Sequence, residues 1–157
     1  MSNAVTPTAP SAEERFKELG LSLPAIPKRT GNFVSCVPVG DLLFVCGQGS
    51  HSILGKVGVE VDIDTAYKAA REAVLHLLAL VKEELGSLDR VERIVKLLGF
   101  VNCEAGFDRS PQVLNGASDL LVEIFGESGR HARSAVGVIA LPHNFAVEVE
   151  MILQVKS

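Results

Sequence analysis

The sequence predicts an α+β domain in which two long helices cover one face of a mostly antiparallel sheet. The clearest signal is the strict alternation over residues 145–155, where every second residue is apolar and would face a core. The second signal is the order of the segments, which runs helix, strand, strand, helix, strand, helix, strand, strand. The third is composition: 47% of the 157 residues are apolar, enough for one domain with a single core.

The N-terminal segment carries one short helix. Residues 1–10 are small, polar and proline-bearing, so we expect them to form a mobile tail. Ser11 is predicted to cap the helix, because acidic residues follow it in the first turn, and Gly20 is predicted to end it. Residues 21–27 contain two prolines, which predicts an extended connector.

Two strands are predicted next, at residues 33–39 and 42–46, joined by a tight turn at Gly40-Asp41. The second run is uniformly apolar, which predicts a central strand. It ends in Gly47-Gln48-Gly49. Glycines at this point would allow the backbone to approach a ligand closely.

A long helix is predicted over residues 64–85, with Asp64 as its N-cap and Gly86 as its stop. Its alanines and leucines recur at helical spacing and would form the buried side. A long strand over residues 91–103 follows.

The second long helix is predicted over residues 110–125. Ser110 is expected to be its N-cap, and Pro111 occupies the first helical position, where proline is favoured. Glycines at 126 and 129 mark its end.

Residues 133–155 are predicted to form a hairpin in which two strands face each other across Pro142, His143 and Asn144. Arg133 would lie near one end of this hairpin and Glu148 on the opposing strand, so we expect both to reach one site. Ala135, a small residue on the same face as Arg133, would leave room for a ligand. The sheet face away from the helices would be covered by self-association.

Composition argues against several classes of function. The net charge is −4 and basic residues do not cluster, which argues against a general nucleic-acid binder. No apolar run approaches the roughly 20 residues of a membrane span. Three unpatterned cysteines, Cys36, Cys46 and Cys103, are typical of reduced thiols in a cytoplasmic protein. The dispersed histidines argue against a zinc site, so we expect no metal.

Three segments of the chain resemble the RidA family, also called YjgF or L-PSP. Residues 40–48 (GDLLFVCGQ) resemble its paired strands, and residues 94–115 resemble its next strand, loop and helix start. The most specific segment is 132–150, with Ala-Arg-Ser, then Leu-Pro, then Glu-Val-Glu. The resemblance covers nearly all of the chain after residue 30. It therefore divides the chain into a tail, short helix and connector over 1–30 and a RidA-like domain over 31–157.

The resemblance implies a chorismate-mutase-like fold, a homotrimer and clefts between subunits. By the same resemblance, Arg133 would bind a substrate carboxylate. Glu148 would position the water that hydrolyses a 2-imino acid and releases ammonia. No cofactor would be needed, because water is the nucleophile and the imine carbon is already electrophilic. The substrate-binding residues would be Arg133, Ala135, Phe33, Cys46, Gly47 and Asn115.

The chain departs from the family pattern at three of these residues. Cys46 replaces a serine, Phe33 replaces a tyrosine as we align it, and Ala135 replaces a cysteine. Two hydroxyl groups are thereby lost from the expected cleft. Without the resemblance, Arg133 would be read as a surface ion-pair residue, Glu148 as a solvated strand residue and Asn115 as a surface amide.

Three functions remain to be separated. The first is an enamine/imine deaminase acting on small imino acids, with Arg133 and Glu148 supplying its chemistry. The second is a non-catalytic trimeric binder of small carboxylate metabolites, which the two lost hydroxyls favour. The third is an endoribonuclease, against which the acidic balance weighs. We expect a cytoplasmic homotrimer that acts on a small molecule and binds neither membrane nor nucleic acid.

Overall fold

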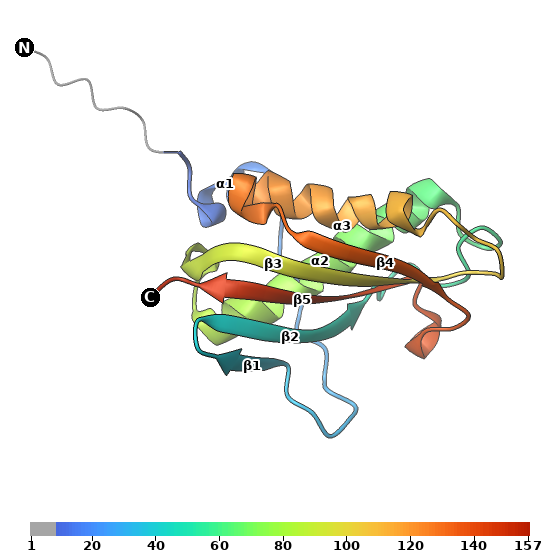
Figure 1. The fold of residues 1–157 in the computed structure, drawn as a ribbon, viewed down its shortest axis with the longest axis horizontal. Coiled ribbons are helices and arrows are strands. Elements are labelled where there is room, and N and C mark those ends of the chain that lie inside the picture. The colour runs from blue at the N-terminus through green and yellow to red at the C-terminus, as the bar shows by residue number, and fades with distance from the viewer. Residues whose placement is uncertain (1–8) are drawn as a thin grey trace, which may run out of the picture.

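The computed structural model describes residues 9–157 as an α+β domain, which confirms the predicted fold class and the predicted order of its elements (Figure 1). Residues 1–8, and with them most of the predicted mobile tail, lie outside the described residues. The elements are α1 (Ala12–Glu18), β1 (Cys36–Val39), β2 (Leu42–Gly49), α2 (Ile63–Leu85), β3 (Val91–Asn102), α3 (Ser110–Phe125), β4 (Ala132–Val138) and β5 (Val147–Val155).

The five strands form one sheet in the order β1-β2-β5-β3-β4. Three of its pairs are antiparallel, and only β3 and β4 run parallel. The long helices α2 and α3 pack on the same face, α2 against β2 and β5 and α3 against β3 and β4. Figure 1 views the other face, with α2 seen behind the strands. We call this uncovered side the open face.

The predicted hairpin of the last two strands is wrong. β3 lies between β4 and β5 and pairs with both of them. α3 returns the chain to the end of the sheet at which β3 began, so β4 runs parallel to β3, as crossovers of this length do. The chain then crosses the end of β3 and comes back on its other side as β5 (Figure 1).

Asn102, at the end of β3, holds this crossing connection. Its backbone N–H donates to the Ala146 carbonyl at 2.9 Å, and its side-chain amide donates to the Phe145 carbonyl at 3.2 Å. Lys56 donates to the Asn102 side chain at 3.1 Å and also to the Ile139 carbonyl. These bonds fix the segment between β4 and β5 to the end of β3.

The alternation along β5 is confirmed. Val147, Val149 and Leu153 are fully buried and Met151 almost fully, whereas Glu150 between them is exposed. Alternation decides which face a side chain joins, but it carries no information on which strand lies alongside.

Two of the predicted helix caps, Ser11 and Gly86, are confirmed, and the start of α2 lies earlier than predicted. Ser11 caps α1 with a reciprocal capping box to Glu14, as expected. The N-cap of α2 is Asp62, not Asp64, since the Asp62 carboxylate accepts from the Thr65 N–H at 2.7 Å. Gly86 ends α2 in the left-handed conformation with φ 81°.

Two further boundaries were predicted wrongly. α3 begins at Ser110 itself, and the residue before it makes no side-chain cap bond, so Ser110 is the first helical residue and not the N-cap. β1 begins at Cys36, which leaves Phe33 outside the sheet. It lies in the segment between α1 and β1, residues 19–35, which we call the connector from here on. The Phe33 ring therefore lies at the surface beside β1 and β2.

The two long helices touch most closely at Gly116 of α3. A Cβ atom at this position would lie 2.0 Å from the Tyr67 carbonyl oxygen of α2. That atom belongs to the backbone and cannot rotate away. Glycine is therefore required for the two helices to pack together over the sheet.

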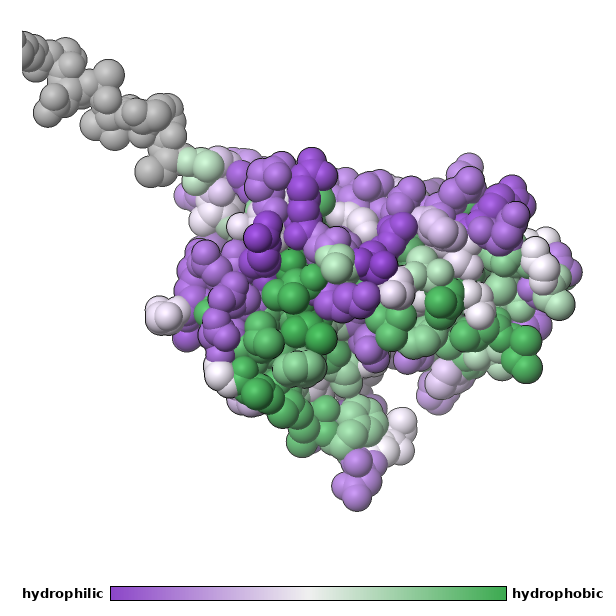
Figure 2. Space-filling view, in the orientation of Figure 1, coloured by the Kyte–Doolittle hydropathy of each residue, from purple (hydrophilic) through white to green (hydrophobic). Residues whose placement is uncertain are grey.

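The open face carries apolar side chains in cross-strand rows. Val37, Phe44 and Ile152 form one row across β1, β2 and β5, and Lys96 of β3 continues this row as a charged residue. Phe44 is 40% exposed, and Val136 of β4 is 41% exposed. Figure 2 shows this face, with apolar surface gathered over β1 and β2 and again toward the right-hand end of the strands. Apolar surface of this extent is typical of a face that associates with another surface.

Within residues 9–157, no helix has the length and apolar character required to cross a membrane. The three cysteines are free thiols.

Replacing Gly116 by alanine should lower the free energy of unfolding by about 1–3 kcal/mol, because the added methyl group overpacks a backbone contact. Chemical denaturation of the purified variant measures this loss. Gln112→Ala, an exposed change on the same helix, is the matched control and should stay within about 0.5 kcal/mol of the parent. Equal stability of the Gly116 variant and the control would contradict the close contact between the helices.

Candidate active site

The predicted site residues lie in two separate clusters within one chain. Phe33, Cys46, Gly47 and Glu148 line one cavity at the end of β2. Arg133 and Asn115 lie together beside the start of α3, in contact with each other. Ala135 shares its face of β4 with Arg133 and packs against the core.

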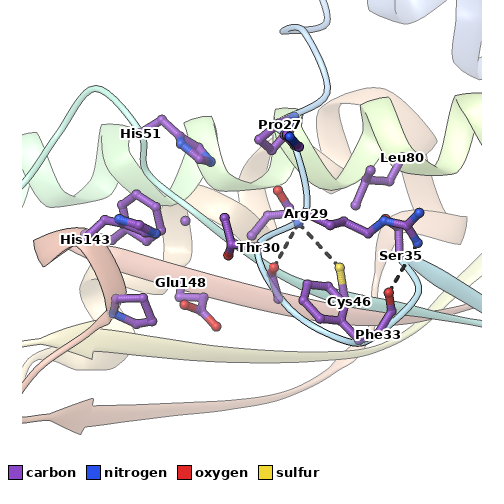
Figure 3. A pocket seen from close by; sticks show the side chains of 16 residues that line it. Pro27, Arg29, Thr30, Phe33, Ser35, Cys46, His51, Leu80, His143 and Glu148 are labelled. Atoms are coloured by element: carbon purple, nitrogen blue, oxygen red, sulfur yellow. Dashed lines mark hydrogen bonds between the residues drawn. The ribbon is translucent and has the colours of Figure 1, made fainter.

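The first cluster surrounds a cavity of about 360 Å³, here called the Glu148 pocket (Figure 3). The connector, the end of β2 with the residues that follow it, α2, and the turn before β5 with the start of β5 border it. Its lining residues are Pro27, Lys28, Arg29, Thr30, Phe33, Ser35, Cys46, Gly47, Gln48, Gly49, His51, Leu80, Pro142, His143, Phe145 and Glu148.

β2 is irregular where it borders this pocket. Its pairing with β5 is regular up to Val45 and resumes at Gln48, so that a bulge falls between them. Bulges turn side chains away from their regular direction and are frequent at functional sites. A Cβ on Gly47 would lie 2.5 Å from the Glu148 carboxylate oxygen, so any larger residue here would displace the Glu148 side chain from its present position.

The position of the lost serine is occupied by the Cys46 thiol. Its sulfur accepts a hydrogen bond from the Gln48 side-chain amide at 3.4 Å, and the same amide donates to the Gly47 carbonyl at 2.9 Å. The Cys46 backbone N–H donates to the Ser35 carbonyl at 2.9 Å, which ties the connector to β2.

Glu148 is a carboxylate in a site that disfavours its charge. It is half-buried, and within residues 9–157 no basic side chain forms an ion pair with it. Burial raises the pKa of Glu148 above its ordinary value, and the neighbouring charge of Glu150 raises it further. Such a carboxylate accepts a proton more readily near neutral pH than an exposed one does.

Sequence reasoning missed the aromatic wall of the pocket. The Phe145 ring lies edge-on to the His51 ring at 4.8 Å and is tilted against the His143 ring at 5.4 Å. No spacing in the sequence joins these two histidines, since 92 positions separate them. The only local signal was the Pro142-His143 pair within a predicted turn.

The second cluster holds the Arg133 guanidinium by three neutral acceptors. It donates to the Asn115 side-chain oxygen at 3.0 Å, to the Ser118 hydroxyl at 3.0 Å and to the Pro111 carbonyl at 3.2 Å. Within residues 9–157 Arg133 forms no ion pair. A guanidinium has five N–H groups, so two remain for a further acceptor.

Ser118 is itself oriented by His131. The His131 Nδ1–H donates to the Gly129 carbonyl at 2.6 Å, so Nε2 is left to accept from the Ser118 hydroxyl at 3.0 Å. Burial lowers the pKa of His131, and the charge of Arg133 lowers it further, although the bond to Gly129 acts in the opposite direction. A neutral imidazole thus turns the Ser118 oxygen toward Arg133.

Arg133 and Glu148 belong to opposite faces of the sheet. Arg133 is paired with the buried Leu97 and reaches α3, so it lies on the helix side. Glu148 lies between the buried Val147 and Val149, so it points to the open face. The expectation that both side chains of one chain reach the same cleft is therefore wrong. It assumed that β4 and β5 pair directly, whereas β3 lies between them.

Within residues 9–157, no three metal-ligating side chains converge on a point that could hold an ion. The chemistry available at the two clusters is therefore that of a half-buried carboxylate with a raised pKa and of a fixed guanidinium.

Comparisons with known proteins agree on one family. The model of the YjgF/chorismate mutase-like family, described as putative endoribonuclease, matches residues 13–154. Protein TCP17 of Trypanosoma cruzi is 40% identical in an alignment of 148 residues that covers 90% of this chain and 92% of that protein.

Solved structures share the fold. The crystal structure of a putative endoribonuclease from Shewanella oneidensis has a TM-score of 0.89 at 32% identity and covers 93% of this chain and 100% of that one. RidA from an Antarctic Psychrobacter has a TM-score of 0.56 at 26% identity, over 83% of this chain and 94% of its own. The chain is therefore more similar in structure to the Shewanella protein than to RidA.

Glu148→Gln should raise the free energy of unfolding at pH 7–8, because glutamine removes a charge that the folded protein disfavours. The raised pKa means that the folded chain holds this proton to higher pH than the unfolded chain does. The cost of ionised Glu148 is thus fully present above the raised pKa and disappears as the pH falls below the ordinary value of 4.5.

Thermal unfolding of the parent and the variant between pH 4 and pH 8 tests this prediction. The advantage of Glu148→Gln should shrink toward the acidic end. Glu92→Gln, which changes an exposed carboxylate on β3, should show no such trend. A variant that is less stable than the parent at pH 8 would show that the pocket stabilises the Glu148 charge.

Proposed function

This chain belongs to the YjgF/chorismate mutase-like family, and on that premise we propose that it hydrolyses reactive 2-imino acids to 2-oxo acids and ammonia. The observation that carries the proposal is the half-buried Glu148, whose pKa is raised by burial in a cavity large enough for a small substrate. A carboxylate of this kind is suited to take a proton from water.

The reaction needs one water and no oxidant. The imine reacts in its N-protonated form. The water oxygen bonds to the imine carbon while Glu148 takes one of the water protons, and the π electron pair of the C=N bond moves to the nitrogen. Glu148 then returns its proton as the carbon–nitrogen bond breaks. Ammonia leaves with the electron pair of that bond, and the remaining hydroxyl loses its proton to become the 2-oxo group.

The substrate carboxylate would bind Arg133. Its two unused N–H groups match the two oxygens of a carboxylate, and the planar guanidinium can meet them side by side. Asn115, Ser118 and Pro111 already hold the Arg133 side chain in place. Arg133 therefore loses little conformational entropy when it binds a ligand.

A second copy of the chain is needed to bring the two clusters together. Arg133 and Glu148 lie on opposite faces of one sheet, and the open face carries exposed apolar residues such as Phe44 and Val136. We propose a homotrimer in which Arg133 of one copy faces the Glu148 pocket of the next. The three free thiols support the cytoplasm as its proposed location.

A second candidate is a non-catalytic trimer that binds small carboxylates. Phe33 and Cys46 favour it, because both line the pocket without the hydroxyl groups expected there. Endoribonuclease activity, which the description of the family includes, is disfavoured by the net charge of −4.

Ammonia release from imino acids generated in solution by an amino-acid oxidase tests the proposed reaction. Glu148→Gln should lower the rate by about 10²–10⁴, the usual contribution of a general base. Its affinity for a non-reactive 2-oxo acid should change little, since the lost charge acts on water and not on the bound ligand.

Glu150→Gln is the matched control: it changes the exposed carboxylate two positions along the same strand. Glu150 raises the pKa of Glu148 less than burial does, so this variant should retain most of the rate. Carboxylate binding without ammonia release by the parent protein would favour the non-catalytic binder. RNA cleavage by the same preparation that is lost in Glu148→Gln would favour the nuclease. Undiminished ammonia release by Glu148→Gln would remove this residue from the mechanism.

A further inference from the structure

Part of the Glu148 pocket has no role in the hydrolysis just described. The reaction needs space for a carboxylate, an imine carbon and a water, whereas the cavity has about 360 Å³. Pockets for small organic ligands begin at roughly 300 Å³, and one water occupies about 30 Å³. A substrate with a methyl side chain would leave much of this volume unused.

The additional space lies between two aromatic walls. Phe33, on the connector, forms one wall, and Phe145 with the rings of His51 and His143 forms the other. Figure 3 shows Phe33 on one side of Glu148, His143 on the other and His51 above it.

The connector wall is held in place by the backbone. Arg29 donates from its guanidinium to the Phe33 carbonyl at 3.2 Å, which closes the loop that carries the ring. The ring also packs on that loop, since a Cβ on Gly31 would be 3.0 Å from it. Ser35 accepts from the Cys46 N–H and fixes the end of the loop to β2.

The opposite wall is fixed through strained backbone. His143 and Asn144 have φ angles of 54° and 59°, in the left-handed region that non-glycine residues seldom adopt. Gly55 donates to the Asn144 carbonyl at 2.8 Å, and Asn102 donates to the Asn144 side chain at 3.2 Å. Surroundings that maintain such strain often belong to a functional site. Phe145 itself fills the space beside Gly49, where a Cβ would collide with its ring.

The charges near the pocket favour a neutral occupant. Glu148 repels a second acidic group on the substrate. Lys28 and Arg29 also line the pocket, but both are exposed to solvent, where water and salt screen their charges. An uncharged ring between aromatic walls gains both apolar burial and edge-to-face contacts.

We propose that this space is a side-chain subsite and that the preferred substrates are 2-imino acids with an aromatic side chain. The proposal rests on the imine hydrolysis proposed above and names its substrate class. The subsite is built by the connector before β1, so the N-terminal segment contributes to specificity.

Initial rates of ammonia release decide the substrate class when imines are generated from phenylalanine, alanine and glutamate. The parent protein should show kcat/KM for the phenylalanine-derived imine at least about tenfold above that for the alanine-derived one, as differences in apolar side-chain contact generally produce. Phe33→Ala should bring this ratio closer to one. Val34→Ala changes a neighbour that is also exposed but does not line the pocket, and it should leave the ratio unchanged.

An equal or higher kcat/KM for the alanine- or glutamate-derived imine would overturn the subsite while leaving the hydrolysis intact. If no imine is hydrolysed, the proposed function fails, and calorimetry decides the subsite alone. Phenylpyruvate should then bind more tightly than pyruvate, and Phe33→Ala should remove the difference. Equal affinity of the parent for the two ligands would overturn the subsite in that case as well.

Discussion

The alternation of side chains across β5, β3 and β4 is the constraint on which the rest of the structure depends. Because successive residues point to opposite faces, Val147 and Val149 in the core require that Glu148 point to the open face. Arg133 of β4 pairs with Leu97 of β3, so both side chains lie on the same face, and Arg133 points toward α3. One strand inserted between β4 and β5 therefore separates the two charged groups that the proposed reaction needs.

Each of these groups is held in an unfavourable state within a single chain. Glu148 is a half-buried carboxylate with a raised pKa, and Arg133 is a partly buried cation with neutral acceptors only. Buried charge without a partner lowers stability, and such costs are commonly retained where function requires them. A bound carboxylate would neutralise Arg133, and a proton taken from water would neutralise Glu148.

Much of the fold could be predicted from local patterns, because alternation, caps and glycine stops act within a few residues. Ser11, Gly86 and the buried side of β5 are examples. The position of β3 could not be predicted in this way. It depends on which strands pair after the α3 crossover. Because β4 was predicted to pair with β5, Arg133 and Glu148 were wrongly placed in one cleft of a single chain.

The site was predictable in part for the same reason. Glu148 and Arg133 were identified through a resemblance that keeps the order of residues, and the structure gives each of them a distinct environment. The roles of His143, Ser118 and His131 depend on contacts between distant segments or on a left-handed backbone, and no sequence spacing records these. The depth of the pocket likewise depends on how the connector folds back onto β2.

Activity in mixed assemblies tests most directly whether the site is completed between copies. Arg133→Ala and Glu148→Gln chains, each inactive alone, would be co-expressed in equal amounts, and light scattering would check for three times the 16.7 kDa chain mass. If each cleft takes Arg133 from one copy and Glu148 from another, about a quarter of the clefts are intact after random assembly. We predict about that fraction of the parent rate of ammonia release. A mixture no more active than either variant alone would contradict the shared cleft.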